Sequence, residues 1–140
     1  MRLMHAMLRV KNLERSIAFF DLLGLAEHRR VDHPSGRYTL CYLRERSGAS
    51  DFEIELTYNW DHTGDYTVGN SFGHIAFEVD DINVACDMLA GQGAVIARPP
   101  RDGHMAFVKT PDGVSIELLQ RGGAIAPRAP YTSLPNQGSW

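Results

Sequence analysis

The pattern of apolar and polar positions along the chain predicts one series of elements in its first half. Residues 3–10 alternate between the two kinds, which is typical of a half-buried strand. Residues 13–23 repeat their apolar positions at helical spacing, between a capping Asn12 and Gly24. Alternating stretches bounded by turn residues then predict three strands, at 26–32, 37–44 and 51–60. The order of this half is therefore βαβββ.

The second half restarts this plan after a segment rich in Asp, Thr, Gly and Asn. Residues 74–79 predict a strand, and Asp81 caps a helix that ends near Gly93. Alternation then predicts three further strands, at 95–98, 104–109 and 114–120. We therefore expect four segments: a first βαβββ module at 1–62, a linker at 63–71, a second βαβββ module at 72–121 and a Pro/Gly-rich tail at 122–140 that wraps the surface or a partner chain.

The two halves also match residue by residue. MHAMLRVKN aligns with GHIAFEVDD, so that His5 falls on His74 at an offset of 69 residues. IELTYNW aligns with IELLQRG at an offset of 62 residues, so that Glu55 falls on Glu117. Self-similarity of this kind indicates a duplicated module.

Composition and charge exclude several classes of function. The net charge is −3, with acidic and basic residues interspersed, so the chain has neither a basic stripe for nucleic acid nor a polybasic patch for a membrane surface. Cys41 and Cys86 form no CxxC pair and no apolar leader precedes His5, which favours a reduced, cytoplasmic setting. The apolar runs are too short to span a bilayer. We expect a cytoplasmic protein without nucleic-acid or membrane partners.

The repeated His and Glu form a candidate metal site. Side chains alternate along a strand, so Glu55 and Glu117 are expected on the face of each module away from its helix. Together with His5 and His74 they provide two imidazoles and two carboxylates, a set that suits Ni²⁺, Co²⁺, Mn²⁺, Fe²⁺ or Zn²⁺. Each residue alone is more often an ordinary polar group, but their recurrence at equivalent positions favours a metal site. The other histidines have no equivalent in the other module and are expected at solvent or loop positions: His28, His33, His62 and His104.

Five stretches resemble the glyoxalase I family of the vicinal-oxygen-chelate superfamily: HAMLRVKNLERSIAFF, IELTYNW, FGHIAFEVDD, RPPRDGHMAFVKTPDG and SIELLQ. Together they span most of residues 1–121. IELTYNW is the most specific of them, because the superfamily at large shares the strand plan and the PDG turn but not TYNW. The resemblance implies an α+β fold in which two paired βαβββ modules form a cupped mixed sheet.

The resemblance also implies an activity. Proteins of this family are lyases that isomerise the hemithioacetal of methylglyoxal and glutathione to S-lactoylglutathione, which detoxifies methylglyoxal. By resemblance Glu117 is the catalytic base and Glu55 is its mirror partner, able to handle the other face of the substrate. Four residues fall on the family's metal positions: His5, Glu55, His74 and Glu117. A histidine at the first of these resembles the Ni²⁺- or Co²⁺-activated branch, with Zn²⁺ as a further candidate.

Substrate-binding residues and a partner follow from the same resemblance. Arg9 and Asn59 match positions that hold the γ-glutamyl end of glutathione, and Arg101 falls near a basic position that meets the glycyl carboxylate. Guanidinium groups and an amide suit a tripeptide with two carboxylates. The resemblance further implies a homodimer in which the first module's ligands meet the second module's ligands of the partner chain.

Three alternatives remain open on the sequence. An acyl-CoA epimerase would use the same enolate chemistry, but it lacks TYNW. An extradiol dioxygenase needs two His, one carboxylate and open positions on Fe²⁺, and a fourth ligand counts against it. A non-catalytic protein that sequesters a drug in the same cup has no need of two carboxylates and would bind its ligand without metal.

Overall fold

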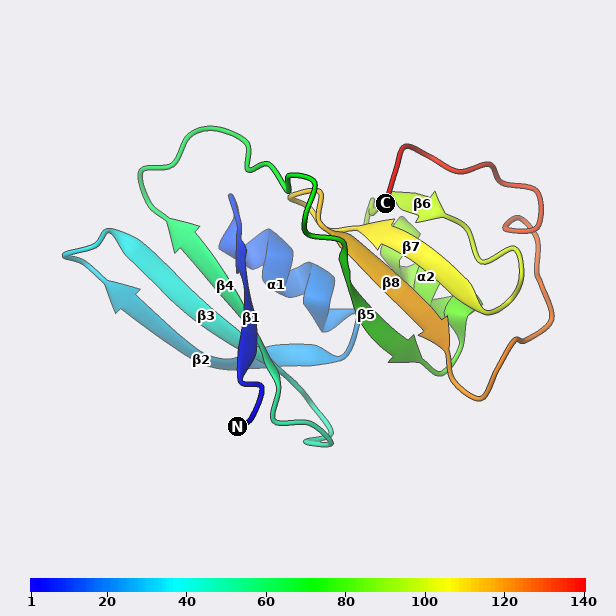
Figure 1. The fold of residues 1–140 in the computed structure, drawn as a ribbon, viewed down its shortest axis with the longest axis horizontal. Coiled ribbons are helices and arrows are strands. Elements are labelled where there is room, and N and C mark those ends of the chain that lie inside the picture. Colours follow the sequence, from blue (N-terminus) through cyan, green and yellow to red (C-terminus); the bar gives the residue numbers. More distant parts are fainter. The chain divides into compact units, whose positions relative to one another are not determined.

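Each half of the chain folds into a four-stranded mixed sheet with one helix, in a computed structural model that describes residues 1–140 (Figure 1). The chain divides into unit 1, Met1–Thr67, and unit 2, Val68–Trp140. The boundary lies inside the segment 63–71. The predicted α+β class and the βαβββ order of both halves are confirmed. Neither helix is long and apolar enough to cross a membrane.

Unit 1 contains β1 (His5–Arg9), α1 (Leu13–Asp21), β2 (Leu25–His33), β3 (Tyr38–Glu45) and β4 (Glu53–Asn59). Its strands lie in the order β1-β4-β3-β2, with β1 parallel to β4 and the other neighbours antiparallel. Short turns join β2 to β3 and β3 to β4, and these neighbours pair with each other. β1 instead pairs with β4, the last strand of the unit. His5 and Glu55 are thereby placed on neighbouring strands.

One face of this sheet packs on α1. The helix begins at Asn12, whose side chain accepts a hydrogen bond from the Arg15 N–H, and it buries Phe19 and Phe20. Alternate residues of β3 and β4 are fully or almost fully buried on the same side: Cys41, Leu43, Ile54 and Leu56. Burial raises the pKa of the Cys41 thiol to about 11. The opposite face carries the intervening residues and is called the open face below.

Unit 2 repeats this arrangement with β5 (His74–Val79), α2 (Ile82–Gly91), β6 (Ile96–Arg98), β7 (Met105–Lys109) and β8 (Ser115–Gln120). Its strand order is β5-β8-β7-β6, with β5 parallel to β8. Asp81 caps α2 by accepting hydrogen bonds from two backbone N–H groups. Gly24 and Gly93 follow the two helices with φ of 84° and 81°, a left-handed conformation that favours glycine.

The tail after β8 has no regular structure and packs on unit 2. The buried Tyr131 hydroxyl donates to Asp87 Oδ1 at 2.6 Å, which anchors the tail to α2. The backbone N–H of Gln137 donates to the Ala97 carbonyl at 2.8 Å. The tail therefore packs against α2 and β6 of its own unit.

Candidate metal and active site

The first predicted pair is formed on the open face of unit 1. In the parallel ladder between β1 and β4, His5 lies opposite Glu53 and Met7 opposite Glu55, so all of these side chains share one face. His5 Nε2 lies 3.1 Å from Glu55 Oε2. The imidazole is 40% exposed and the carboxylate 12% exposed, so the pair is reached from solvent mainly through the histidine.

The second predicted pair has the same geometry on the open face of unit 2, which is the face of its sheet opposite the buried Ile116 and Leu118. His74 Nε2 lies 3.1 Å from Glu117 Oε2, with side-chain exposures of 41% and 15%. Two ligand atoms bound to adjacent positions of one ion, each about 2.1 Å from it, are about 3 Å apart. An imidazole nitrogen and a carboxylate oxygen in this arrangement therefore fit a divalent metal, and each unit presents one such pair; their role as metal ligands stays a prediction.

An aromatic ring packs against each histidine. In unit 1 the His5 and Tyr42 rings meet edge to face, with centroids 5.9 Å apart and planes at 76°. In unit 2 the His74 and Phe107 rings meet at 5.2 Å and the same angle. Tyr42 lies opposite Glu55 in its ladder, as Phe107 lies opposite Glu117. The two sites therefore share one packing arrangement, but only unit 1 has a hydroxyl there.

Hydroxyl groups surround the carboxylate of Glu55. Thr57 Oγ1 lies 3.3 Å from Glu55 Oε1, within hydrogen-bond distance. Burial raises the pKa of Tyr42, and the neighbouring Glu55 carboxylate, which accepts a hydrogen bond from its hydroxyl, raises it further. Glu55 is thus held by two side chains in addition to His5.

The predicted γ-glutamyl contacts lie together on unit 1. Arg9 is exposed on the same face of β1 as His5, and it pairs with Thr57 in the ladder. Asn59, two residues further along β4, donates from Nδ2 to the Tyr66 hydroxyl at 3.0 Å. Both residues are at the end of the sheet away from the start of β4. Their role in binding substrate stays a prediction.

Arg101, the third predicted substrate residue, is held by the tail of unit 2. Its Nη1 donates to the Leu134 carbonyl at 2.8 Å and its Nη2 donates to Asn136 Oδ1 at 2.7 Å. The terminal nitrogens of the guanidinium group therefore already have acceptors in the protein. A role for Arg101 in binding the glycyl carboxylate, which stays a prediction, would require the tail to release it.

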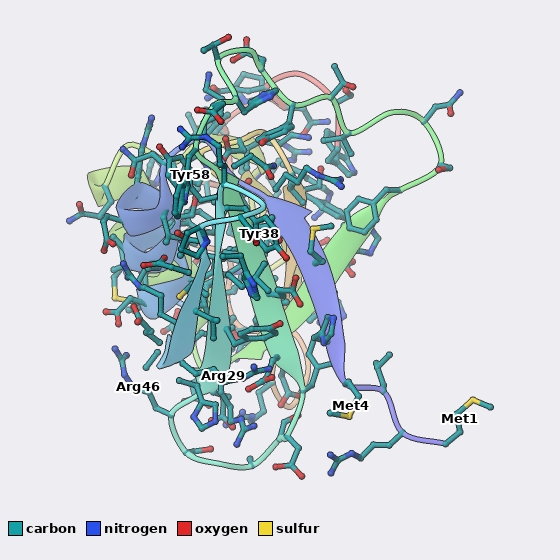
Figure 2. The ribbon with its side chains drawn as sticks, turned by 90° about the vertical axis from the view of Figure 1, so that its left-hand side faces the viewer. Met1, Met4, Arg29, Tyr38, Arg46 and Tyr58 are labelled. Carbon is teal, nitrogen blue, oxygen red and sulfur yellow. The ribbon has the colours of Figure 1, made fainter.

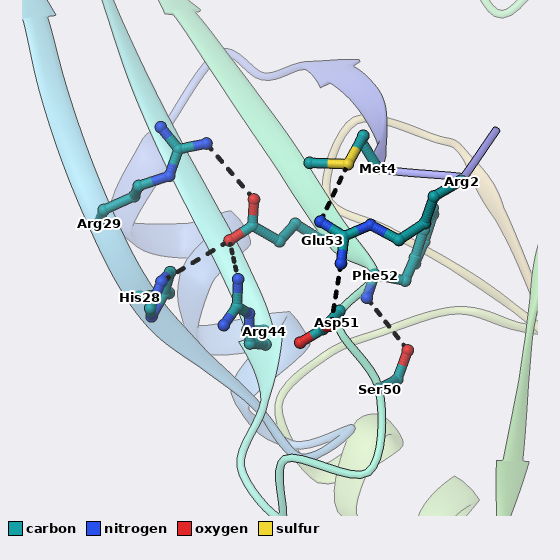
Figure 3. A network of polar contacts seen from close by, with 9 residues as sticks. All are labelled: Arg2, Met4, His28, Arg29, Arg44, Ser50, Asp51, Phe52 and Glu53. Atoms are coloured by element: carbon teal, nitrogen blue, oxygen red, sulfur yellow. Dashed lines mark hydrogen bonds and ion pairs between the residues drawn. The ribbon is translucent and has the colours of Figure 1, made fainter.

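The sequence interpretation missed a charged cluster around Glu53 on the open face of unit 1 (Figure 3). Figure 2 labels one of its members, Arg29. Glu53 Oε1 lies 3.1 Å from Arg44 Nη2, and Glu53 Oε2 lies 3.4 Å from Arg29 Nη2. His28, expected at a solvent or loop position, is a partly exposed residue of β2 whose Nε2 is 3.9 Å from Glu53. One signal was available: Glu53 and Glu55 are two residues apart and therefore share a face of the strand.

Comparison with known proteins gives consistent matches over most of the chain. The model of the Glyoxalase/Bleomycin resistance protein/Dioxygenase superfamily matches residues 2–118. The lactoylglutathione lyase of Neisseria meningitidis serogroup A is 45% identical over 127 residues, which cover 86% of this chain and 91% of that protein. A probable lactoylglutathione lyase of Vibrio cholerae is 42% identical over 131 residues, covering 89% and 94%.

Solved structures agree with these matches. The trypanothione-dependent glyoxalase I of Leishmania major is 38% identical and superimposes with a TM-score of 0.77 over 86% of both chains. Glyoxalase I of Zea mays is 32% identical, with a TM-score of 0.76 over 90% of this chain and 47% of that one.

Proposed function

The chain belongs to the Glyoxalase/Bleomycin resistance protein/Dioxygenase superfamily and is a lyase of the glyoxalase I type, and we propose that its two His–Glu pairs form the active site. The superfamily includes binding proteins and dioxygenases, so membership alone does not separate the alternatives. The curated relatives that cover this chain favour the lactoylglutathione lyase. The observation that carries the site is the repeated 3.1 Å contact between imidazole and carboxylate.

The substrate is the hemithioacetal that forms from glutathione and a 2-oxoaldehyde such as methylglyoxal. The product is the 2-hydroxyacyl thioester, S-lactoylglutathione for methylglyoxal, so the reaction removes methylglyoxal from the cytoplasm. Arg9 and Asn59 bind the γ-glutamyl end through charge-assisted and amide hydrogen bonds. Arg101 approaches the glycyl carboxylate once the tail releases its guanidinium group.

The metal site is shared between two chains of a homodimer. His5 and Glu55 of one chain provide half of the ligands, and the partner's His74 and the partner's Glu117 provide the rest. Each pair has two ligands and an exposed imidazole, which supports completion by a second chain. The ion is Ni²⁺ or Co²⁺, with Zn²⁺ also compatible with these ligands. When bound, it polarises the substrate oxygen atoms and stabilises negative charge on them.

Glu117 acts as the catalytic base. Its carboxylate takes the proton from the carbon that carries sulfur and returns it to the neighbouring carbon. The hydroxyl proton passes from the oxygen of the first carbon to that of the second, so the hemithioacetal becomes the 2-hydroxyacyl thioester. His74 fixes one oxygen of this carboxylate at 3.1 Å. Glu55 is additionally held by Thr57 and Tyr42, so it is better suited to a fixed position beside the other face of the substrate.

The activity is tested with metal-free protein that is reloaded separately with Ni²⁺, Co²⁺ and Zn²⁺. Thioester formation from methylglyoxal and glutathione is followed by ultraviolet absorbance. We expect turnover with at least one metal, highest with Ni²⁺ or Co²⁺. Absence of thioester with all three metals would overturn the proposed function.

Shared sites are tested by mixing two inactive variants, His5→Ala and His74→Ala. A mixed dimer has one site with both substitutions and one site with neither. Random mixing gives half mixed dimers, so activity should return to roughly a quarter of the wild-type value. If each site were formed within one chain, the mixture would stay inactive. Refolding either variant alone is the control.

A further inference from the structure

Two arginines converge on a single carboxylate at one end of the open face of unit 1. Figure 3 shows Arg29 and Arg44 reaching Glu53 from neighbouring strands, with His28 beside them. The Glu53 side chain is only 5% exposed, whereas the side chains of Arg29 and Arg44 are 49% and 34% exposed. The carboxylate is therefore covered, and the cationic groups remain open to solvent.

The guanidinium groups have more donors than the protein satisfies. Each carries five N–H donors in a fixed planar arrangement. Arg44 donates to Glu53 at 3.1 Å; its Nε has no partner but is buried, so only the donors on the exposed part of this side chain can meet a ligand. Arg29 donates to Glu53 at 3.4 Å and also interacts with the Tyr42 hydroxyl. Two positive charges thus face one negative charge, with donors left over, which is the arrangement that binds a further oxyanion.

This cluster lies beside the proposed reaction centre. Glu53 is the ladder partner of both His5 and Arg44. The guanidinium carbon of Arg29 lies 3.3 Å from the centroid of the Tyr42 ring, which packs against His5. A cation stacked on an aromatic ring has a defined position.

The direction of the substrate follows from the proposed contacts. Arg9 pairs with Thr57 near the end of β4, whereas Glu53 begins this strand. If the γ-glutamyl end lies at Arg9 and the reacting carbons lie at His5 and Glu55, the aldehyde-derived end extends toward the cluster. The group that meets Arg29 and Arg44 is then the substituent of the 2-oxoaldehyde.

The fold itself does not require these charges. At the equivalent positions of unit 2, Lys109 lies opposite Ser115, and its Nζ donates to the Ser115 hydroxyl at 2.7 Å. The same ladder therefore forms with a single cation and no carboxylate. Removing a carboxylate from water also costs free energy unless its charged partners compensate for the lost hydration. The cluster in unit 1 is an addition to a common scaffold.

We propose that Arg29 and Arg44 form an anion subsite for a carboxylate at the far end of the 2-oxoaldehyde, so that the enzyme accepts acidic 2-oxoaldehydes as well as methylglyoxal. This inference rests on the proposed isomerase function. Glu53 holds the two guanidinium groups in place, and the carboxylate of the substrate takes the donors that Glu53 leaves unused.

The kinetic test compares methylglyoxal with 4,5-dioxopentanoate, a 2-oxoaldehyde that ends in a carboxylate, each with glutathione. The readout is the ratio of the two kcat/KM values. Loss of a charge-assisted hydrogen bond should lower this ratio for the acidic aldehyde about tenfold or more in Arg44→Gln. The matched control is Arg46→Gln, since Arg46 is an exposed arginine paired with Asp21. An unchanged ratio in Arg44→Gln would overturn the proposal.

A second variant separates binding from structural support. Glu53→Gln keeps the size of the side chain but removes the competing negative charge. The Michaelis constant for the acidic aldehyde should then fall relative to that for methylglyoxal, whereas loss of a purely structural group would raise both. Glutathione esterified at its glycyl carboxylate distinguishes the source of the anion. If the effect of Arg44→Gln disappears with this ester, the two arginines bind the glycyl carboxylate of glutathione and the proposal is wrong.

Binding without turnover keeps the two proposals distinguishable. Succinate serves as the probe, and its binding to metal-free protein is followed by nuclear magnetic resonance shifts of unit 1. We expect saturable shifts in the wild type and in Arg46→Gln, and their loss in Arg44→Gln. Succinate binding without isomerase activity would refute the proposed function alone. Isomerase activity with methylglyoxal but without succinate binding would refute the subsite alone.

Discussion

The two units carry the same His–Glu pair at the same distance but surround its carboxylate with different residues. In unit 1 Glu55 has Tyr42 opposite it on β3 and Thr57 two residues along its strand. In unit 2 the equivalent positions around Glu117 are apolar: Phe107 and Leu119. Both carboxylates are largely covered, at 12% and 15% exposure. The difference therefore lies in hydrogen bonding and not in burial.

This difference suggests how a duplicated site can divide its work. Two hydroxyl groups restrain Glu55, whereas the polar side chain that contacts Glu117 is His74. A restrained carboxylate suits a fixed ligand and a less restrained one suits moving a proton between two carbons, which is the assignment proposed for Glu55 and Glu117. Pairs of carboxylates with one role each are a recurrent solution in catalysis.

The largest expected effect comes from replacing one carboxylate at a time. Glu117→Gln should lower kcat by about 10²–10⁴-fold, the usual contribution of a general base, while the protein keeps part of its metal. Glu55→Gln should instead lose more metal affinity and less kcat per bound ion. Steady-state kinetics and metal content measure both quantities. Glu78→Gln is the matched control, because Glu78 lies on the same face but pairs with Arg121. Equal losses of kcat and of bound metal in Glu117→Gln and Glu55→Gln would contradict the division of roles.

The tail gives unit 2 a stabilising contact of its own. Tyr131 is 4% exposed and donates to Asp87. Tyr131→Ala should lower the free energy of unfolding by about 3 kcal/mol, through the loss of a buried ring and of a hydrogen bond to a charged group. Tyr131→Phe should lose about half of this. Urea unfolding measures both. If the alanine variant were as stable as the wild type, the tail would add nothing to unit 2.

The loop before β7 makes unit 2 sensitive to acid. Burial would raise the pKa of Asp102, but the Arg98 guanidinium and the backbone N–H groups of His104 and Met105 outweigh it and lower the pKa. A lowered pKa stabilises the fold above the unfolded value of about 4, and this contribution is lost as the pH falls below it. After allowance for solvent screening, since the side chain is 45% exposed, Asp102→Asn should cost about 1 kcal/mol at neutral pH.

The measurement is the unfolding free energy of Asp102→Asn and wild type between acidic and neutral pH. The difference should shrink as the pH falls. The matched control in unit 1 is Asp61→Asn, because Asp61 also pairs with an arginine, Arg37, but is more exposed, at 63%. A constant difference for Asp102→Asn across this range would contradict the assignment.

The smallest effect is expected where unit 1 is made to resemble unit 2. Tyr42→Phe removes one hydroxyl from Glu55 and keeps the ring that packs on His5. We expect kcat/KM to fall by about 2–5-fold, which corresponds to one hydrogen bond of ordinary strength. A fall as large as that of Glu117→Gln would show that the Tyr42 hydroxyl takes part in the reaction. Phe107→Tyr is the reciprocal variant.

The sequence was sufficient to predict the elements and the pairing of each histidine with its glutamate, for one physical reason. Strand residues alternate between faces, and a duplication repeats this alternation, so His5 and Glu55 could be assigned to one face from their spacing and their counterparts. Their 3.1 Å contact then follows from the parallel pairing of β1 with β4. The alternation along a strand and the repeat between the two halves can both be recognised in a single sequence.

The charged cluster and the hold of the tail on Arg101 could not be predicted in this way. Whether Arg29 reaches Glu53 depends on a shift in the β2–β3 register between Glu27 and Arg29, which no periodic pattern reveals. Arg101 bonds to residues 33 and 35 positions away in a tail without any period. Contacts set by an irregular register or by an aperiodic segment require the three-dimensional structure.

The two buried cysteines have a meaning for a protein that handles electrophiles. A 2-oxoaldehyde reacts with thiolates, and a thiol with a raised pKa is rarely a thiolate. Burial in the helix-covered cores raises the pKa of Cys41 to about 11 and that of Cys86 to about 12. The protein therefore keeps its own thiols buried and protonated, away from the compound that it consumes. Glutathione remains the thiol that meets the aldehyde, and the two cysteines of the enzyme do not compete with it for addition to the carbonyl group.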